Sequence, residues 1–293
     1  MRKTKDKRFA RYSVPAKIAL GVFFLFFLFE AVINFYPVLF VVNNSLKTSE
    51  EIYKDSMALT MTWTFSNYVD MFNLFQVKGG IYFEEMLFNS VWQTVLFLAA
   101  NMTASVMVSY VLARYRFPGH GLIFGVLIFV QTIPIIGSDS AGYKLYSALN
   151  LINNPFTIWL SWLNGFTYSA FILYGTFKGI SKGYSESAKI DGASNITIFT
   201  RIIFPLAFPA VIALLVTNFV GTWNNYSISM ISLNKYPNLA YGLYIFQLDA
   251  LYMEQGDTVF YTALVITALP GLLLYAGMQK MMVKNLTVGG IKG

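Results

Sequence analysis

Long apolar runs alternate with short polar segments along the chain. A membrane-spanning helix needs about 20 predominantly apolar residues, because its backbone groups must be hydrogen-bonded within the segment. The pattern therefore predicts an all-α polytopic membrane fold, with a basic segment at residues 1–17 and one transmembrane domain at residues 18–293. The six predicted transmembrane helices are Ile18 to Val42, Met86 to Ala113, Leu122 to Ile136, Phe156 to Phe177, Leu206 to Ile231 and Val259 to Val283.

Composition supports a membrane protein. Hydrophobic residues make up 56% of the chain and charged residues only 12%, whereas a soluble domain has about a quarter of its residues charged. The absence of cysteine excludes a disulfide framework, a thiolate metal site and a cysteine nucleophile. The one histidine, His120, is expected in a loop at a membrane surface, and we predict no metal site.

The distribution of positive charge predicts the orientation. If the six spans alternate in direction, 16 of the 21 Lys and Arg residues fall on one side. Because cytoplasmic loops are enriched in Lys and Arg, both termini, the loop after the second span and the polar stretch around Ser185 are predicted to be cytoplasmic. The net charge of +7 is then a topology signal, and no nucleic-acid partner is expected.

One polar stretch, "SESAKIDGASNITIFTRIIFP" from Ser185 to Pro205, interrupts the apolar runs. Ser185 is predicted to cap a short helix, with Gly192 in the left-handed conformation that follows a helix end. Ser194 is predicted to cap a second helix, which Pro205 ends before the next span. The stretch is therefore expected to form a helical hairpin.

The second helix of this hairpin carries an apolar stripe. Ile196, Phe199 and Ile203 recur at the i, i+3 and i+7 positions of one helix face. An apolar edge exposed to the cytoplasm needs a partner, and a short helix can bury such an edge in a groove of another protein.

At these residues the chain resembles the permease subunits of binding-protein-dependent ABC importers. Glu186-Ser187-Ala188, Gly192 and Ile202-Ile203-Phe204-Pro205 keep the spacing of that family's signature, although Ser187 and Phe204 replace its Ala and Leu. The similarity continues over about Asn89 to Gly293, including "ARYRFPG" and "GTWNNY". The closing tail is similar to that of the maltose-type second permease subunit, which indicates the carbohydrate-importer branch.

The resemblance implies that the hairpin is a coupling element seated in a cleft of a cytoplasmic ATPase subunit. The chain has no GxxxxGK[ST] sequence for nucleotide phosphates, so we expect it not to be an enzyme. ATP and Mg²⁺ are then expected in the partner ATPase. The residues predicted to couple to that ATPase are Glu186, Ala188, Asp191, Gly192, Ala193, Ile202 and Pro205.

The same resemblance implies the other partners: a second permease subunit, two ATPase subunits, an extracytoplasmic solute-binding protein, membrane lipid and a sugar substrate. The outward loop from Ser232 to Thr258 is rich in tyrosine and is expected to meet the solute-binding protein. Glu30 lies within the first predicted span, where an acidic residue indicates either a buried partner contact or a transport pathway.

Polar side chains within the fourth and fifth predicted spans are candidates for a substrate pathway. Amide side chains and aromatic faces suit sugar recognition, and polar stripes of spanning helices face protein or water. The alternative is that they form hydrogen bonds between helices and only hold the bundle together. The candidates are Asn164, Tyr168, Asn218, Thr222, Trp223 and Asn225.

A secondary transporter of a small polar solute, driven by an ion gradient, is the main alternative function. It would have internal repeats with broken helices and acidic residues at mid-membrane, of which only Glu30 is found. A membrane enzyme is disfavoured because no HExxH sequence is present. The residues leave open which sugar is carried, which of the two permeases holds it, and whether the solute is instead a phosphate, peptide or polyamine.

Overall fold

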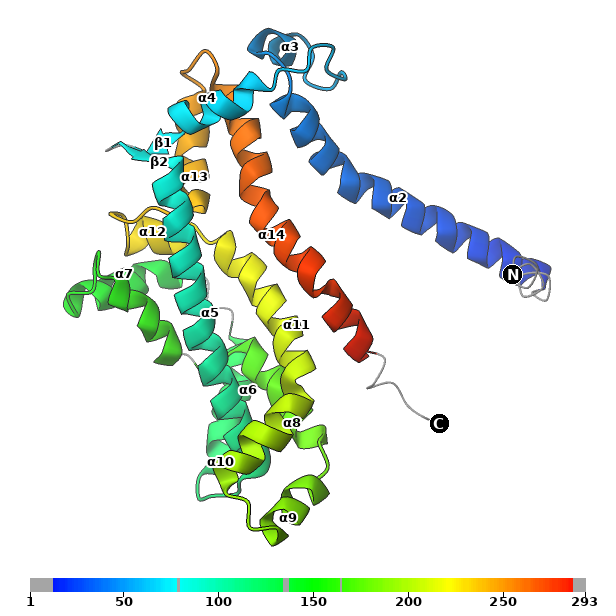
Figure 1. Cartoon of the computed structure of the whole chain (residues 1–293), viewed down its shortest axis with the longest axis vertical. Coiled ribbons are helices and arrows are strands. Elements are labelled where there is room, and N and C mark those ends of the chain that lie inside the picture. The colour runs from blue at the N-terminus through cyan, green and yellow to red at the C-terminus, as the bar shows by residue number, and fades with distance from the viewer. Residues whose placement is uncertain (1–12, 78–79, 134–136, 164, 287–293) are drawn as a thin grey trace. The chain divides into compact units, whose positions relative to one another are not determined.

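The computed structural model describes residues 13–77, 80–133, 137–163 and 165–286. These residues are mainly helical, with one two-stranded antiparallel ribbon in which Gln76 pairs with Tyr82 (Figure 1). The elements in chain order are α2 (Val14–Ser45), α3 (Ser49–Lys54), α4 (Ser66–Leu74), β1 (Gln76–Val77), β2 (Ile81–Tyr82), α5 (Phe83–Arg114), α6 (His120–Thr132), α7 (Ser138–Ala148), the 3₁₀ helix η1 (Pro155–Leu163), α8 (Tyr168–Gly179), α9 (Gly183–Ile190), α10 (Asn195–Ile198), the π-helix η2 (Phe199–Ile203), α11 (Phe204–Trp223), α12 (Ser227–Ile231), α13 (Leu239–Ala250) and α14 (Gly256–Leu286).

The chain divides into two compact units. The first comprises Met1–Met71 with Ala250–Val265, and the second comprises Phe72–Asp249 with Ile266–Gly293.

In the first unit, α2 is a long apolar helix with Pro15 in its first turn and Pro37 inside it. Its apolar side chains are largely exposed. Asn34 Nδ2 donates a hydrogen bond of 2.7 Å to the Glu30 carbonyl and one of 3.5 Å to its carboxylate. The expectation that Glu30 marks a partner contact or a pathway stays a prediction.

The segment after α2 is held by hydrogen bonds from side chains to backbone. Lys47 is buried, and its ammonium group donates to the carbonyls of Asp55 at 2.9 Å and Ser56 at 3.0 Å. Asn67 Nδ2 donates to the carbonyls of Ser45 and Lys47. A buried ammonium group is costly without such acceptors, so these contacts specify the path of the loop.

Glu51 organises the exposed part of this loop. Its carboxylate accepts hydrogen bonds from the hydroxyls of Thr60 and Thr62 and from the backbone amide of Met61. Its own amide donates to Thr48 Oγ1 at the start of α3. One carboxylate therefore connects the first turn of α3 to residues 60–62 beyond it.

The second unit is built around α5, which packs against η1, α8 and α11 (Figure 1). Its contact face carries small and polar residues, such as Ala104, Ser105 and Ser109, that are buried. Ser105 Oγ and Thr167 Oγ1 share a hydrogen bond of 2.8 Å between α5 and the N-cap of α8. Small residues allow membrane helices to approach closely, which explains this composition.

The all-α membrane fold is confirmed. Among the described residues, four helices are long and apolar enough to cross a membrane: Val14–Ser45, Phe83–Arg114, Asn195–Trp223 and Gly256–Gly277. The third predicted span, Leu122 to Ile136, overlaps α6, which is shorter, and its last residues lie outside the described part. The predicted total of six spans stays a prediction.

Two predicted spans differ from the helices observed. Residues 156–177 form η1 and α8 rather than one helix, because Gly165 brings the chain against α5 and Thr167 starts α8 as an N-cap. The predicted fifth span ended at Ile231, but α11 ends at Trp223. There Asn225 Oδ1 accepts a hydrogen bond from the amide of Ser227, and such local side-chain bonds compete with a continuing helix.

His120 does not lie in a loop, so that prediction is wrong. It is the first residue of α6, it is buried, and its Nε2 hydrogen-bonds to the carbonyl of Leu112 at 2.7 Å. The ring pairs one of the free carbonyls near the end of α5, a group that the helix itself leaves unpaired.

The close approach at Gly165 predicts a measurable steric effect. An added Cβ would lie 2.8 Å from Val108 Cγ2 of α5. We expect Gly165→Ala to lower the free energy of unfolding by about 1–3 kcal/mol. Gly175→Ala is the matched control, because nothing lies within 4 Å of its added Cβ, and it should be neutral or stabilising by up to about 1 kcal/mol.

Denaturant unfolding in detergent measures both variants, and a Val108→Ala change should restore most of the stability that Gly165→Ala removes. Equal effects of the two glycine substitutions would contradict the steric explanation.

The loop around Glu51 predicts a pH dependence. Desolvation raises the pKa of Glu51, but the hydrogen bonds from Thr62, Thr60 and the amides of Met61 and Thr48 outweigh it, so its pKa lies below the ordinary 4.5. A lowered folded-state pKa adds stability above the unfolded value, and that stability is lost as pH falls through the folded value. Exchange of the Met61 amide, corrected for its intrinsic rate, should therefore accelerate as pH falls below 4.5.

Glu51→Gln should remove this pH dependence, whereas Glu50→Gln, next to it in the exposed first turn of α3, should keep it. If the pH dependence of Met61 amide exchange persists in Glu51→Gln, the Glu51 carboxylate is not its cause.

Candidate functional site

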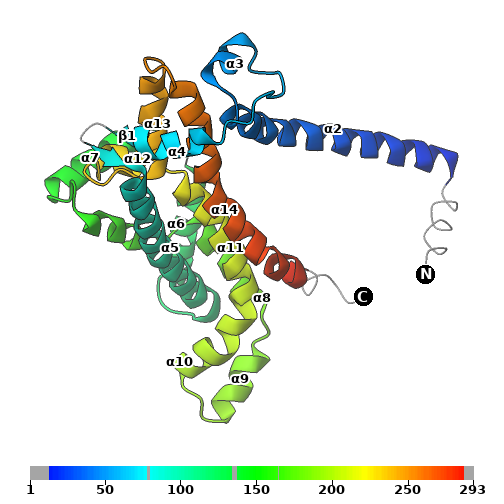
Figure 2. The same ribbon diagram turned by 45° about the horizontal axis from the view of Figure 1, so that its top comes forward.

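The polar stretch forms a helical hairpin at one end of the second unit, as predicted (Figures 1 and 2). Its first helix, α9, begins at Gly183, and Lys182 is its N-cap residue. Ser185 therefore lies inside the helix, and the prediction that it caps α9 is wrong. The amides of Ser185 and Glu186 already donate to the Lys182 carbonyl, and Ser181 Oγ accepts from the amide of Gly183.

The turn between the two helices depends on Gly192. Its φ angle is +80°, which confirms the predicted left-handed conformation. The amide of Gly192 donates to the carbonyl of Lys189 at 3.0 Å, and the amide of Ala193 donates to the carbonyl of Ala188 at 2.9 Å. This pair of bonds is the Schellman motif, in which glycine adopts the left-handed conformation without steric cost.

The second helix starts at the predicted cap. Ser194 Oγ accepts a hydrogen bond of 3.2 Å from the amide of Thr197. Helix α10 then passes through η2 into α11 without a break. Pro205 does not end the helix, so that prediction is wrong: Phe204 donates to Phe199 in a π-type bond just before the proline. The wider π turn changes the backbone path where the proline ring would otherwise meet the preceding turn.

The predicted apolar stripe divides between two faces. Ile203 is completely buried, whereas Ile196 is 76% exposed. A π turn adds residues to one turn of a helix, so residues before and after η2 lose their common face. Ile198 is buried in place of Ile196, a change that helical spacing alone does not predict.

The hairpin is anchored through its inner face. Ala188, Ile198 and Ile203 are buried in a cluster with Leu173 and Phe177 of α8. Two more predicted coupling residues, Ala193 and Ile202, are half-buried and pack against the same cluster. These residues therefore join the hairpin to the bundle.

The remaining predicted coupling residues are exposed: Glu186, Asp191, Gly192 and Pro205. Two large apolar side chains that were not among the predicted coupling residues accompany them: Ile190, 87% exposed, and Ile196. Ile190 was identifiable as the last apolar residue before the turn, but its exposure depends on how α9 packs. The surface thus combines acidic groups with isolated apolar side chains.

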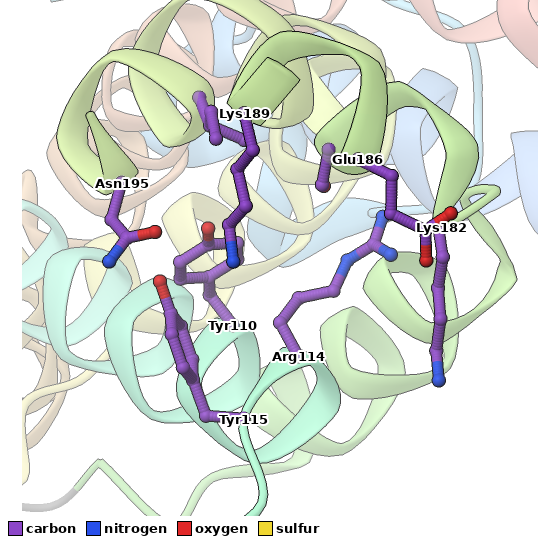
Figure 3. A pocket seen from close by; sticks show the side chains of 9 residues that line it. Tyr110, Arg114, Tyr115, Lys182, Glu186, Lys189 and Asn195 are labelled. Atoms are coloured by element: carbon purple, nitrogen blue, oxygen red, sulfur yellow. The ribbon is translucent and has the colours of Figure 1, made fainter. Parts of the chain in front are cut away.

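A cavity of about 170 Å³ lies between the hairpin and the end of α5 (Figure 3). Its polar lining was not predicted, and its most unusual member is Arg114, the last residue of α5. Two guanidinium nitrogens of Arg114, Nε and Nη2, are buried and have no hydrogen-bond partner among the described residues. The lining residues are Tyr110, Arg114, Tyr115, Lys182, Ser185, Glu186, Lys189, Asn195 and Ile198.

The candidate pathway residues do not form one cluster in the described structure, and Asn164 lies outside the described residues. Tyr168 is exposed at the first turn of α8. Asn218 Nδ2 donates to Ser169 Oγ at 2.8 Å, which links α11 to α8. Thr222 is half-buried, and Asn225 is exposed beyond the end of α11.

Trp223 occupies an apolar environment. It is buried, its Nε1 donates to the carbonyl of Thr267 at 3.1 Å, and its ring stacks on Phe219. Both rings line a mainly apolar cavity of about 570 Å³ between α5, α11 and α14. Asn218, Thr222 and Asn225 are not among its lining residues, so the pathway assignment stays a prediction.

A buried polar network holds the loop at residues 236–239 to α5. Gln93 Nε2 donates to the carbonyl of Tyr236 at 2.7 Å, and Gln93 Oε1 accepts from Asn238. Asn89 Nδ2 donates to the carbonyl of Pro237, and Ser90 Oγ accepts from the amide of Leu239. No local sequence pattern indicates these bonds, because their partners are more than 140 residues apart.

Comparison with known proteins agrees with this architecture. The diacetylchitobiose uptake system permease protein of Streptomyces coelicolor is 28% identical over 290 residues, which cover 98% of this chain and 90% of that protein. The arabinooligosaccharides transport system permease protein of Bacillus subtilis is 27% identical over 272 residues, covering 92% of this chain and 94% of that protein.

A similar fold occurs in the crystal structure of a bacterial ABC transporter involved in the import of the acidic polysaccharide alginate. The TM-score is 0.78 at 21% identity, and the match covers 92% of this chain and 98% of that chain.

Residues 105–288 match the family model described as the inner membrane component of binding-protein-dependent transport systems. This range includes the hairpin and more than half of the chain, so the predicted resemblance is confirmed. The chain therefore belongs to the family of binding-protein-dependent transport system inner membrane components.

Proposed function

We propose that this chain is a permease subunit of an ATP-driven importer of a carbohydrate, and that the hairpin docks on a cytoplasmic ATPase through residues 185–205. The observation that carries the proposal is the hairpin itself, which has a buried inner face and leaves Glu186, Ile190 and Ile196 exposed. The carbohydrate substrate is supported by the similarity to permeases named for diacetylchitobiose and arabinooligosaccharides. Family membership argues against the alternative of a secondary transporter.

The hairpin has the connections that mechanical coupling needs. Its second helix continues from Asn195 to Trp223, so displacement of the hairpin displaces α11. Its buried cluster also ties α9 to α8. An importer alternates between inward-open and outward-open states, and ATP binding in the partner shifts that equilibrium only if the two states hold the ATPase differently.

The other functions of the transporter belong to partner subunits. A second permease subunit would complete the pathway, two ATPase subunits would supply ATP and Mg²⁺ chemistry, and an extracytoplasmic solute-binding protein would deliver the sugar to the outward loop. The charge distribution supports cytoplasmic termini and a cytoplasmic hairpin. The exposed α2 helix, with Glu30 on it, supports a protein partner there, because an acidic side chain facing lipid is costly.

Within this chain, Asn164, Tyr168, Asn218, Thr222, Trp223 and Asn225 remain the proposed substrate contacts. The hydrogen bond from Asn218 to Ser169 also fits a purely structural role, and the two roles are separable by experiment.

Charge reversal at the hairpin tests the ATPase contact. Glu186→Lys should reduce the amount of ATPase subunit retained in a pull-down by about tenfold or more, because it places a repulsive charge in the interface. Glu50→Lys is a matched reversal at an exposed glutamate of α3 and should retain the ATPase fully.

Gly192→Asp should also reduce retention, because a side chain at φ +80° strains the turn, and Gly192→Asn should reduce it less, since Asn tolerates this conformation better. Wild-type retention and transport in both Glu186→Lys and Gly192→Asp would refute the docking role.

Paired substitutions test the pathway role of Asn218. Both Asn218→Leu and Ser169→Ala remove the interhelical hydrogen bond, but only the first removes the amide. If the amide contacts sugar, Asn218→Leu should lower the initial transport rate by about tenfold. Ser169→Ala should then transport normally. Equal losses of transport in both variants, with equal losses of thermal stability, would assign Asn218 to bundle packing alone.

A further inference from the structure

The cavity beside the hairpin contains an arginine with unsatisfied hydrogen-bond donors. Arg114 Nε and Nη2 are enclosed by protein, yet neither donates a hydrogen bond to any residue that the structure describes. A guanidinium group stays charged at all physiological pH values, and a buried donor left unpaired costs more than an ordinary hydrogen bond contributes. The arrangement is therefore stabilised by any anion that enters the cavity and accepts from these nitrogens.

Further donors face the same space from the opposite side. The ammonium group of Lys189 reaches toward the hydroxyls of Tyr110 and Tyr115, and Asn195 lies beside them (Figure 3). The Arg114 guanidinium lies across the cavity from this group (Figure 3). Donors thus converge from the end of α5, from α9 and from α10.

The lining has an excess of positive charge. Arg114, Lys182 and Lys189 are balanced only by Glu186, which gives this lining a net charge of +2. Lys182 extends away from the Arg114 guanidinium (Figure 3), so Arg114 and Lys189 are the two cations suited to direct contact. An anion with one or two negative charges complements such a site.

The shape of the cavity favours a phosphate group. Its volume of about 170 Å³ is enough for a small anionic group. Donors that approach from opposite walls require an acceptor with oxygens in several directions. A tetrahedral phosphate offers this arrangement, whereas a carboxylate offers two oxygens in one plane. An arginine fork is also well matched to phosphate.

We propose that this cavity binds a phosphate group through Arg114 and Lys189, and that the bound group holds α9 and α10 of the hairpin against the end of α5. The group comes either from an anionic lipid headgroup or from a free phosphate compound, since both offer the same chemistry. If the hairpin docks on an ATPase as proposed, holding it in place also affects that coupling. This consequence rests on the proposed function, but phosphate binding itself does not.

Amide hydrogen exchange of the purified full chain tests the binding. In micelles of a sugar-based detergent without phosphate, inorganic phosphate should slow exchange of the amides of residues 183–198. At ten times its dissociation constant, a ligand that binds only the closed hairpin lowers the open fraction about elevenfold. Exchange limited by hairpin opening should slow by the same factor.

Three variants locate the site. Arg114→Gln and Lys189→Gln should each raise the dissociation constant for phosphate by about tenfold or more, because each removes a charged donor. Arg116→Gln, an exposed arginine outside the lining, should leave it unchanged. Lys189 is exposed, so its substitution keeps the test valid even if Arg114→Gln fails to fold.

Glu186→Gln separates this proposal from the proposed function. Removing the carboxylate from the lining should tighten phosphate binding by about threefold, whereas the same change should weaken ATPase docking. Tighter phosphate binding with unchanged docking would support the phosphate site and count against the coupling role. Unchanged or weaker phosphate binding in Glu186→Gln would count against the site.

Two further arms identify the source of the phosphate. Protection by inorganic phosphate in undoped micelles indicates a free ligand. Protection only in micelles doped with phosphatidylglycerol, lost in Arg114→Gln, indicates a lipid headgroup. The proposal is overturned if neither arm slows exchange of the hairpin, or if the protection is equal in wild type, Arg114→Gln and Lys189→Gln.

Discussion

The burial of Ala188, Ile198 and Ile203 against Phe177 and Leu173 is the contact on which the rest of the functional end depends. A short helix such as α9 is not stable alone, since helices of this length gain most of their stability from packing. Once this face is buried, the opposite face must be exposed. The exposed positions of Glu186, Ile190 and Ile196 are therefore consequences of the inner packing.

The turn at Gly192 and the π segment before Pro205 give this packing its geometry. The Schellman bonds close α9 and direct the chain back toward α5 and α11. The π turn lets a helix that contains Pro205 continue into the membrane, and it rotates Ile203 onto the buried face. A hairpin made in this way is joined to the bundle at both ends, which is what transmission of force from a docked ATPase requires.

Much of this arrangement was predictable from local patterns. Gly192 and Ser194 have side-chain chemistry that suits one position of a helix end, and both occupy it. The error at Ser185 arose because two serines and a glycine near the start of α9 all suit a helix N-terminus, and sequence does not rank them. The errors at Pro205 and in the apolar stripe have one cause, since helical periodicity assumes 3.6 residues per turn and a π turn breaks it.

The sequence by itself determined the membrane class, the signature hairpin and the family, because apolar length, charge asymmetry and motif spacing are properties of neighbouring residues. Tertiary structure alone decided which side chains meet. The hydrogen bonds of Gln93 with Tyr236 and Asn238, and of Asn218 with Ser169, join distant parts of the chain. The cavity lined by both Arg114 and Lys189 does the same. Such contacts depend on how helices pack in three dimensions, and one sequence carries no local pattern for them.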